Sequence, residues 1–276
     1  MANKKERHIL ALSGGKDSAA LAVYMREKYP DLPLEYVFID SGYELPETNE
    51  YINRIRGILN ISICKIGGAS YNDRKDFEWW LKQKNNYLPS PHHRWCTDIL
   101  KMRPYNQWIE KNCEGQIVHS YVGLRADEKR ERKGNLSNRE YFFQHHPFIE
   151  DGFCYENVKE LLKNSGIGFP SYYHWRSRSG CYFCYYQTKK EWIGLHDHHK
   201  ELFDKAAAME KIDCPTAKQF TWCEGISLRD LVKQRKQILM SSENFIHGKE
   251  KTPNLATSVS SLCKNNFLNP ELLIRR

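Results

Sequence analysis

The chain has no long hydrophobic run. No apolar stretch approaches the roughly 20 residues that cross a bilayer, and the start, MANKKERHIL, has no apolar segment of signal-peptide length. We therefore expect a cytoplasmic protein with no membrane partner. Apolar residues make up 40% and charged residues 28% of the 276 residues, which is typical of a soluble globular protein.

An even, regularly spaced set of cysteines is also absent. The nine cysteines are scattered along the chain, and in a reducing compartment such thiols suggest metal sites, catalysis or core packing before disulfides. The net charge of +8 permits a polyanionic partner but is a weak signal, because basic surfaces are often simply solvated.

Short apolar segments alternate with segments of helical spacing. The predicted strands are residues 8–13, 34–40, 61–67 and 116–124, and the predicted helices are residues 16–29, 46–59, 74–83, 96–112, 188–211 and 227–239. This alternation predicts an α/β fold with a parallel sheet and a ligand crevice at the carboxyl ends of the strands. We expect a nucleotide-binding domain over residues 1–187 and a mostly helical extension over 188–276, whose last part, from Ser241, lacks periodicity.

Two familiar phosphate-binding patterns are missing. Neither the P-loop G-x-x-x-x-G-K-[ST] nor the dinucleotide G-x-G-x-x-G occurs. In their place a predicted strand runs into SGGKDS (Ser13–Ser18), and a helix pattern follows. Adjacent glycines at a helix N-terminus, with one lysine, favour a site for phosphate.

Five segments carry a family resemblance. SGGKDS resembles the signature of the PP-loop ATP pyrophosphatases, the adenine nucleotide alpha hydrolases. VFIDSGYELPET, WCTDILKMRP, YVGLRADE and SRSGCYFC resemble, in order, the DTGxxFPET, CCxxxKxxP, GxRxDE/Q and SIGCxxC segments of the phosphoadenylylsulfate reductase branch. WCTDILKMRP departs from its pattern, because Trp95 replaces the first cysteine and one extra residue precedes the lysine.

The resemblance implies roles for individual residues. The implied nucleotide-binding set is Ser13, Gly14, Gly15, Lys16, Asp17, Ser18, Phe38 and Asp40. The implied catalytic set is Lys16, Asp17, Lys101 and Arg125. Asp40 would lie beside the ribose or a bound Mg²⁺, backbone groups near Phe38 would recognise adenine, and Lys101 and Arg125 would face the phosphates of ATP or the incoming anion.

The cysteines suggest a cofactor. Cys181 and Cys184 form C-x-x-C, a spacing that places two thiolates on one metal or cluster, although a redox dithiol is its main rival. Cys96 matches the position of the family's cysteine pair. We predict a four-iron cluster on Cys96, Cys181, Cys184 and, as fourth ligand, Cys223. Cys154 and Cys214 are rivals for the fourth position, and a four-cysteine zinc site is the alternative.

The C-terminal segment lacks the Glu-Cys-Gly-x-His motif that carries the reductases' catalytic cysteine, although Cys263 is present. We therefore expect an ATP pyrophosphatase that activates an oxygen for replacement by sulfur. The functional resemblance is to the sulfur-incorporating subunit of bacterial DNA phosphorothioation systems (Dnd- and Ssp-type), which implies DNA and a cysteine desulfurase as partners. Alternatives are sulfonucleotide reduction, tRNA thiolation and nucleotide sensing without catalysis. The sequence leaves the oligomeric state open.

Overall fold

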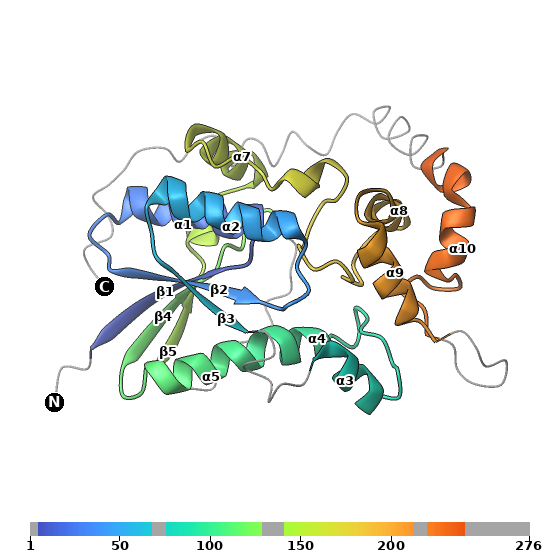
Figure 1. Cartoon of the computed structure of the whole chain (residues 1–276). Coiled ribbons are helices and arrows are strands. Elements are labelled where there is room, and N and C mark those ends of the chain that lie inside the picture. The colour runs from blue at the N-terminus through green and yellow to red at the C-terminus, as the bar shows by residue number, and fades with distance from the viewer. Residues whose placement is uncertain (1–4, 68–75, 129–140, 212–219, 241–276) are drawn as a thin grey trace.

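A parallel sheet covered by helices on both faces forms the body of the protein (Figure 1). The structure is a computed structural model and describes residues 5–67, 76–128, 141–211 and 220–240. The described strands are β1 Glu6–Leu12, β2 Leu34–Asp40, β3 Ile63–Gly67, β4 Ile117–Tyr121 and β5 Phe142–His145. Neighbouring strands all pair in parallel in the order β3-β2-β1-β4-β5. The predicted α/β fold with a parallel sheet is confirmed.

The strand order reverses between β1 and β4. The chain runs outward from β1 through β2 to β3, then returns to the other side of β1 for β4 and β5. Such a reversal opens a crevice at the carboxyl ends of the two central strands, where ligands of open α/β sheets bind. The segments that follow β1 and β4 therefore lie side by side at this position.

The helices divide into those that cover the sheet and those beyond its carboxyl edge. They are α1 Lys16–Lys28, α2 Pro46–Leu59, α3 Phe77–Gln83, α4 Trp95–Thr97, the π-helix η2 Asp98–Met102, α5 Arg103–Asn112, α6 Pro147–Glu150, α7 Tyr155–Asn164, the 3₁₀-helix η3 Ser171–His174, α8 Lys189–His198, α9 Lys200–Ala208 and α10 Leu228–Lys233. None of the described helices is both long and apolar enough to cross a membrane.

Local sequence explains several boundaries. α2 starts with Pro46 at its first turn, where a missing N–H costs nothing, and ends at Asn60 in the left-handed region with a φ of 47°. Asp76 caps the start of α3, because its side chain accepts a hydrogen bond from the Trp79 N–H. α8 starts with a reciprocal capping box between Thr188 and Glu191.

Two cores hold the sheet between its helix layers. On one face, side chains such as Leu10 and Phe38 pack with α1, α2 and α7. On the other face, Ile9 and Val37 pack with α5, which contributes Trp108. The alternation of neighbouring residues between the two cores follows from the period of two in a strand, and Figure 1 shows the two helix layers above and below the sheet.

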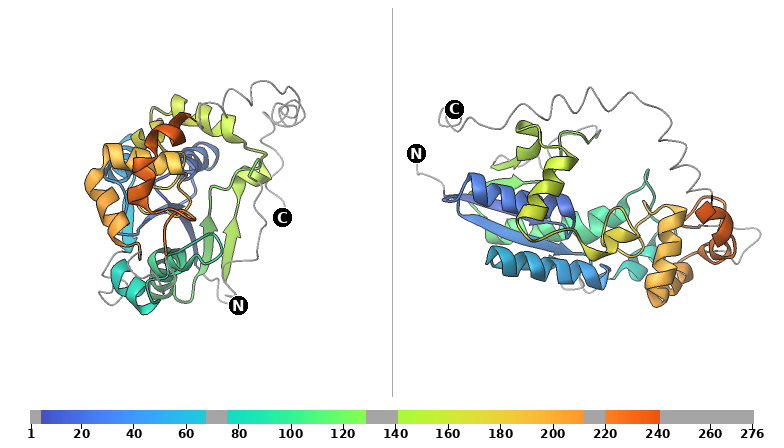
Figure 2. Two further views of the ribbon diagram at one scale, coloured as in Figure 1. Left: turned by 90° about the vertical axis from the view of Figure 1, so that its right-hand side faces the viewer. Right: turned by 90° about the horizontal axis from the view of Figure 1, so that it is seen from above.

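A third core lies beyond the carboxyl ends of the strands, where α8, α9 and α10 gather (Figures 1 and 2). It combines α3 and the segment around Ile99 with Tyr172, Phe183 and the three C-terminal helices. The helical character expected for the C-terminal portion is confirmed, and this core packs residues from both sides of the predicted boundary at 187/188. That boundary stays a prediction.

Some element predictions differ from the structure. The helix expected over residues 188–211 divides at His199, which has a φ of −142° and separates α8 from α9. The last expected helix, residues 227–239, divides at Gln234: α10 ends at Lys233, and residues 235–240 are helical again. β5 and α7 were not predicted, and the expected aperiodic segment from residue 241 lies outside the described residues.

Candidate functional site

The turn between β1 and α1 is shaped for an anion. Gly14 has a φ of +73°, a conformation that favours glycine. The Ser18 hydroxyl accepts a hydrogen bond from the Ser13 N–H at 3.1 Å and donates one to the Gly15 carbonyl at 3.1 Å, which closes the turn. Among the described residues, no side chain caps the start of α1 at Gly15. Its first N–H groups therefore remain available to phosphate oxygens.

Two cations converge on the carboxylate of Asp17. Lys16 Nζ lies 3.0 Å from one oxygen, and Arg125 Nη1 donates to the other at 2.7 Å. Gly123 permits this approach, because a Cβ there would lie 2.7 Å from the Asp17 carbonyl oxygen. Burial alone would lower the pKa of Arg125, but hydrogen bonds to Asp17 and Asp127 outweigh it and raise the pKa. Arg125 is therefore a fixed positive charge beside the turn.

A cavity of about 550 Å³ opens in front of this turn. Its walls are Ser13, Gly15, Lys16, Asp17, Lys101, Arg125, Glu128, Tyr173, Ser177, Arg178, Ser179 and Gly180. The structure thus brings the four predicted catalytic residues to one cavity, although they come from the segments after β1 and β4 and from η2. Cations and backbone N–H groups around one space suit the phosphates of a nucleotide.

Four predicted nucleotide-binding residues lie outside the walls of this cavity. Gly14 and Ser18 shape the turn itself. Phe38 is 1% exposed and packs beneath Gly14. Asp40 pairs with Lys65 at 2.6 Å and accepts a hydrogen bond from the Gly42 N–H at 2.8 Å. The proposed roles of Phe38 and Asp40 toward adenine, ribose and Mg²⁺ stay predictions.

Lys101 lies on η2, and such π-helical turns are rare and occur often at functional sites. Its Nζ is 3.5 Å from Glu44 Oε1, and the Glu44 side chain is only 1% exposed. The Ser41 hydroxyl donates to the same carboxylate oxygen at 2.7 Å. The charge of Glu44 raises the pKa of Lys101 against the opposing effect of burial. A buried carboxylate therefore positions Lys101.

A second cavity, of about 200 Å³, adjoins the first. Three of the predicted cluster ligands, Cys96, Cys181 and Cys184, line it. The other walls are Ser41, Arg94, Thr97, Leu100, Lys101, Arg178, Ser179, Phe183, Tyr185 and Tyr186. Lys101, Arg178 and Ser179 line both cavities, so the phosphate site and the thiols share a wall.

Burial favours the protonated form of two of these thiols, Cys96 and Cys181. It raises the pKa of Cys96 to about 11 and the pKa of Cys181 well above its ordinary value. In the part of the chain that the structure describes, no three His, Cys, Asp or Glu side chains are placed to share one metal ion. The three thiols around this cavity are three of the four thiolates that a four-iron cluster takes from a protein.

Cys223, predicted as the fourth ligand, is not among the residues that line this cavity. It is buried in the third core, and burial followed by the charge of Glu210 raises its pKa to about 11. Glu210 is held by the N–H groups of Trp222 and Leu228 at 3.0 and 2.9 Å. The role of Cys223 stays a prediction, and its rival Cys214 lies outside the described residues.

The residues that sequence reasoning missed include Glu44, which pairs with Lys101, and the wall residues Tyr173, Arg178 and Ser179. Glu44 and Arg178 are charged residues inside two of the motif segments, so a search for unexplained charges there would have found them. Ser179 has a φ of +56°, unusual for a non-glycine residue and a mark of a constrained site. No sequence signal distinguishes Tyr173 from the aromatic residues of the core.

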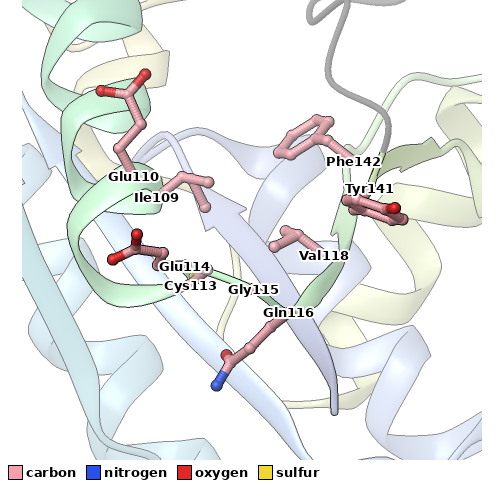
Figure 3. A pocket seen from close by; sticks show the side chains of 9 residues that line it. All are labelled: Ile109, Glu110, Cys113, Glu114, Gly115, Gln116, Val118, Tyr141 and Phe142. Atoms are coloured by element: carbon pink, nitrogen blue, oxygen red, sulfur yellow. The ribbon is translucent and has the colours of Figure 1, made fainter. Parts of the chain in front are cut away.

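A cavity of about 410 Å³ lies at the opposite end of the sheet, beside the starts of β4 and β5 (Figure 3). Its described walls include Ile109, Val118 and Phe142, together with the carboxylates of Glu110 and Glu114. Two carboxylates on its wall repel phosphate, in contrast to the cations that line the cavity in front of the turn.

Comparison with known sequences decides the family. The profile of the phosphoadenosine phosphosulfate reductase domain matches residues 7–174. The chain belongs to this family. The matched segment contains the turn after β1, Cys96, Lys101 and Arg125. The predicted membership in this branch is confirmed, whereas the resemblance to DNA phosphorothioation subunits stays a prediction.

The chain spans about half or less of the curated relatives that it matches. It is 32% identical to protein MJ0066 of Methanocaldococcus jannaschii over 45% of this chain and 24% of that protein. It is 24% identical to MJ0973 of the same organism over 74% of this chain and 47% of that protein. It is 23% identical to the nin region protein ORF290 of Escherichia phage lambda over 46% of this chain and 50% of that protein.

Solved structures with a similar arrangement are distant. The phosphoadenylyl-sulfate reductase from Candida auris, in a phosphate complex, has a TM-score of 0.48 and 12% identity, over 64% of this chain and 82% of that one. The U34-tRNA thiolase NcsA from Methanococcus maripaludis, with its [4Fe-4S] cluster, has a TM-score of 0.42 and 15% identity, over 99% of this chain and 84% of that one.

Proposed function

We propose that this chain is an ATP pyrophosphatase that adenylates an acceptor oxygen, which sulfur then replaces. The observation that carries the proposal is the shared wall of the two cavities, formed by Lys101, Arg178 and Ser179. A two-step exchange needs phosphate chemistry and sulfur chemistry side by side, because an adenylated intermediate that left the site would be hydrolysed.

In the first step, the acceptor oxygen attacks the α-phosphorus of ATP, and the bond to the β-phosphate oxygen breaks. Pyrophosphate leaves with one additional negative charge, on the oxygen that bridged the α- and β-phosphorus atoms, and Lys16, Arg125 and the N–H groups of α1 would stabilise it. Asp17 and Glu128 are the carboxylates on the cavity wall, and their oxygens would hold Mg²⁺ together with the phosphates.

In the second step, a sulfide equivalent attacks the adenylated centre and AMP leaves with the oxygen. A cysteine desulfurase persulfide, together with a thiol reductant, would supply the sulfide. The thiols of Cys96, Cys181 and Cys184 would hold an iron–sulfur cluster that binds this sulfur. Lys101, at the boundary of the two cavities, stabilises negative charge on the departing AMP.

The acceptor we propose is a nucleic acid, specifically the DNA backbone. The positive net charge suits a polyanion. The acceptor is tested by measuring the phosphorothioate content of DNA from two strains. One strain carries the intact gene set, and the other carries the same genes with Lys16→Ala in this chain. Equal phosphorothioate in both strains would contradict the DNA role.

The pyrophosphatase step is tested on its own with ATP labelled at the α-phosphate. Wild-type protein should release AMP and pyrophosphate in a Mg²⁺-dependent reaction, and Lys16→Ala should slow it by about 100-fold or more because a phosphate cation is lost. Lys28→Ala is the matched control, since Lys28 lies in the last turn of the same helix and pairs with Asp151 at 2.8 Å. Release of ADP and phosphate would overturn the assignment.

The family membership favours a second candidate, reduction of a sulfonucleotide. That reaction needs a cysteine nucleophile, and Cys263, the C-terminal candidate, lies outside the described residues. Thioredoxin-dependent release of sulfite from phosphoadenylylsulfate by the purified protein would establish this candidate and displace the first.

A further inference from the structure

Two tyrosines and two arginines form a run of planar groups along the wall of the cysteine cavity. Tyr185 and Tyr186 follow Cys184 directly, and their ring centroids are 4.5 Å apart. The guanidinium carbon of Arg178 lies 4.3 Å from the centroid of the Tyr186 ring. Arg94 Nε donates a hydrogen bond to the Tyr185 hydroxyl at 2.9 Å. We call these four residues the aromatic rim.

The aromatic rim is accessible and positively charged. Tyr185 and Tyr186 are half-buried, whereas Arg94 and Arg178 are exposed. Within the described residues, neither arginine is within 4.0 Å of a carboxylate oxygen, in contrast to Arg125 and Lys101, whose charges are paired with acidic side chains. The rim therefore carries positive charge that no described side chain neutralises.

Half-exposed rings beside unpaired guanidinium groups match the chemistry of an unpaired nucleotide. An exposed base stacks on aromatic rings and guanidinium planes, and the arginines attract its phosphates. A base inside a duplex cannot stack in this way, because both of its faces are already covered by neighbouring bases.

We propose that the aromatic rim binds an unpaired nucleotide of a single-stranded nucleic acid, at the mouth of the cysteine cavity. Arg178 lines both cavities, so a nucleotide held there would lie between the phosphate site and the thiols. The inference rests on the proposed function and deepens it, since it places the acceptor strand and requires that strand to be unpaired.

The test uses short single-stranded DNA and RNA with one 2-aminopurine, and the same sequences as duplexes. Stacking quenches the fluorescence of 2-aminopurine, so quenching reports the contact without any need for catalysis. We expect quenching and tight binding with single strands, and affinity for duplex lower by about tenfold or more. A preference for either DNA or RNA supports the rim and identifies the acceptor.

Variants distinguish stacking from general charge attraction. Tyr186→Leu should reduce single-strand affinity by about tenfold and abolish quenching, whereas Tyr186→Phe, which keeps the ring, should retain both. Tyr141→Leu is the control, because Tyr141 is an exposed tyrosine at the opposite end of the sheet. Arg178→Gln changes an exposed side chain and tests the rim even if Tyr186→Leu does not fold.

Equal affinity for single strands and duplexes, or unchanged quenching in both Tyr186→Leu and Arg178→Gln, would overturn the inference. The proposed function fails separately. Wild-type protein that makes ADP from ATP but quenches 2-aminopurine refutes the pyrophosphatase and keeps the rim, whereas AMP formation without any quenching keeps the pyrophosphatase and refutes the rim.

Discussion

Replacement of Gly14 by alanine should damage the phosphate turn in two separable ways. Gly14 has a φ of +73°, and an added Cβ would lie 2.4 Å from Cγ2 of Thr48, a residue that is 0% exposed at the start of α2. The first effect is backbone strain within the turn. The second is a collision with a neighbouring helix in a packed interior.

The magnitudes follow from each effect. A non-glycine residue in the left-handed region costs about 1–2 kcal/mol. Carbon atoms in contact prefer about 3.5–4.0 Å, so the collision requires a shift of more than about 1 Å, and overpacking of this kind costs about 1–3 kcal/mol. Gly14→Ala should therefore lower the free energy of unfolding by about 2–5 kcal/mol and remove ATP binding by displacing the turn.

The assay is urea unfolding, with ATP binding measured on the folded fraction. Gly57→Ala is the matched control, because Gly57 lies inside α2 and a Cβ there meets nothing within 4 Å. The same substitution at Gly57 should stabilise the protein by about 0.5–1 kcal/mol. Thr48→Ala removes the colliding methyl group, so the double variant should recover about 1–3 kcal/mol relative to the sum of the single changes.

Two results would refute this reasoning. If Gly14→Ala unfolds at the wild-type urea concentration, the turn does not have the strained geometry described. If Thr48→Ala recovers no stability in the double variant, the collision with α2 is not the cause of the loss. Recovery of stability without recovery of ATP binding would support the reasoning, since the backbone strain at Gly14 remains.

Two further predictions concern buried carboxylates. Lys101→Met should destabilise the protein more than Glu44→Gln in urea unfolding. Lys101→Met leaves Glu44, which is 1% exposed, as an unpaired buried charge, whereas Glu44→Gln leaves Lys101, which is about one-third exposed and reaches water. The reverse order of stability would contradict the pairing. The second prediction concerns Glu191. Burial alone would raise the pKa of its carboxyl group, but hydrogen bonds from Ser177 and Thr188 outweigh burial and lower the pKa overall. Its stabilising effect is therefore present above its unfolded pKa, about 4.3, and is lost as the pH falls through the lower folded value. Glu191→Gln should cost about 1–3 kcal/mol at pH 7 and should flatten the acid limb of stability against pH; an unchanged acid limb would contradict this.

The sequence was sufficient for the parts of the fold that depend on local patterns. β2 and α2 have the predicted bounds, Leu34–Asp40 and Pro46–Leu59, because an apolar run with β-branched residues and a proline at a helix start are both local signals. β5 was missed because it is a four-residue edge strand, Phe142–His145, which exposes Phe143 and shows no alternation. Strand pairing with β4, not propensity, determines this element.

The residues of the site also divide into those that local sequence patterns predict and those that depend on long-range contacts. The glycine turn and the charged residues after β4 were predictable, since a motif needs only neighbouring residues. The position of Glu44 beside Lys101 was not, because it depends on a distant segment. Leu45 N–H donates to the Gly180 carbonyl at 2.7 Å, and Tyr182 N–H donates to the Tyr43 carbonyl at 2.9 Å. These long-range hydrogen bonds bring the C-x-x-C segment beside residues 43–45, between β2 and α2, and no periodicity in the sequence reveals them.

This long-range pairing also explains why the two cavities meet. A Cβ at Gly180 would lie 2.1 Å from Thr48 Oγ1 and 2.7 Å from Glu44 Oε2, so only glycine lets the segment before Cys181 approach the start of α2. The phosphate turn is fixed against the same Thr48 from the other side, through Gly14. Two glycines that pack against one buried threonine thus set the distance between the phosphate turn and the thiols. The spacing between the phosphate turn and the thiols is therefore determined by backbone packing, and the charged residues lie within that spacing.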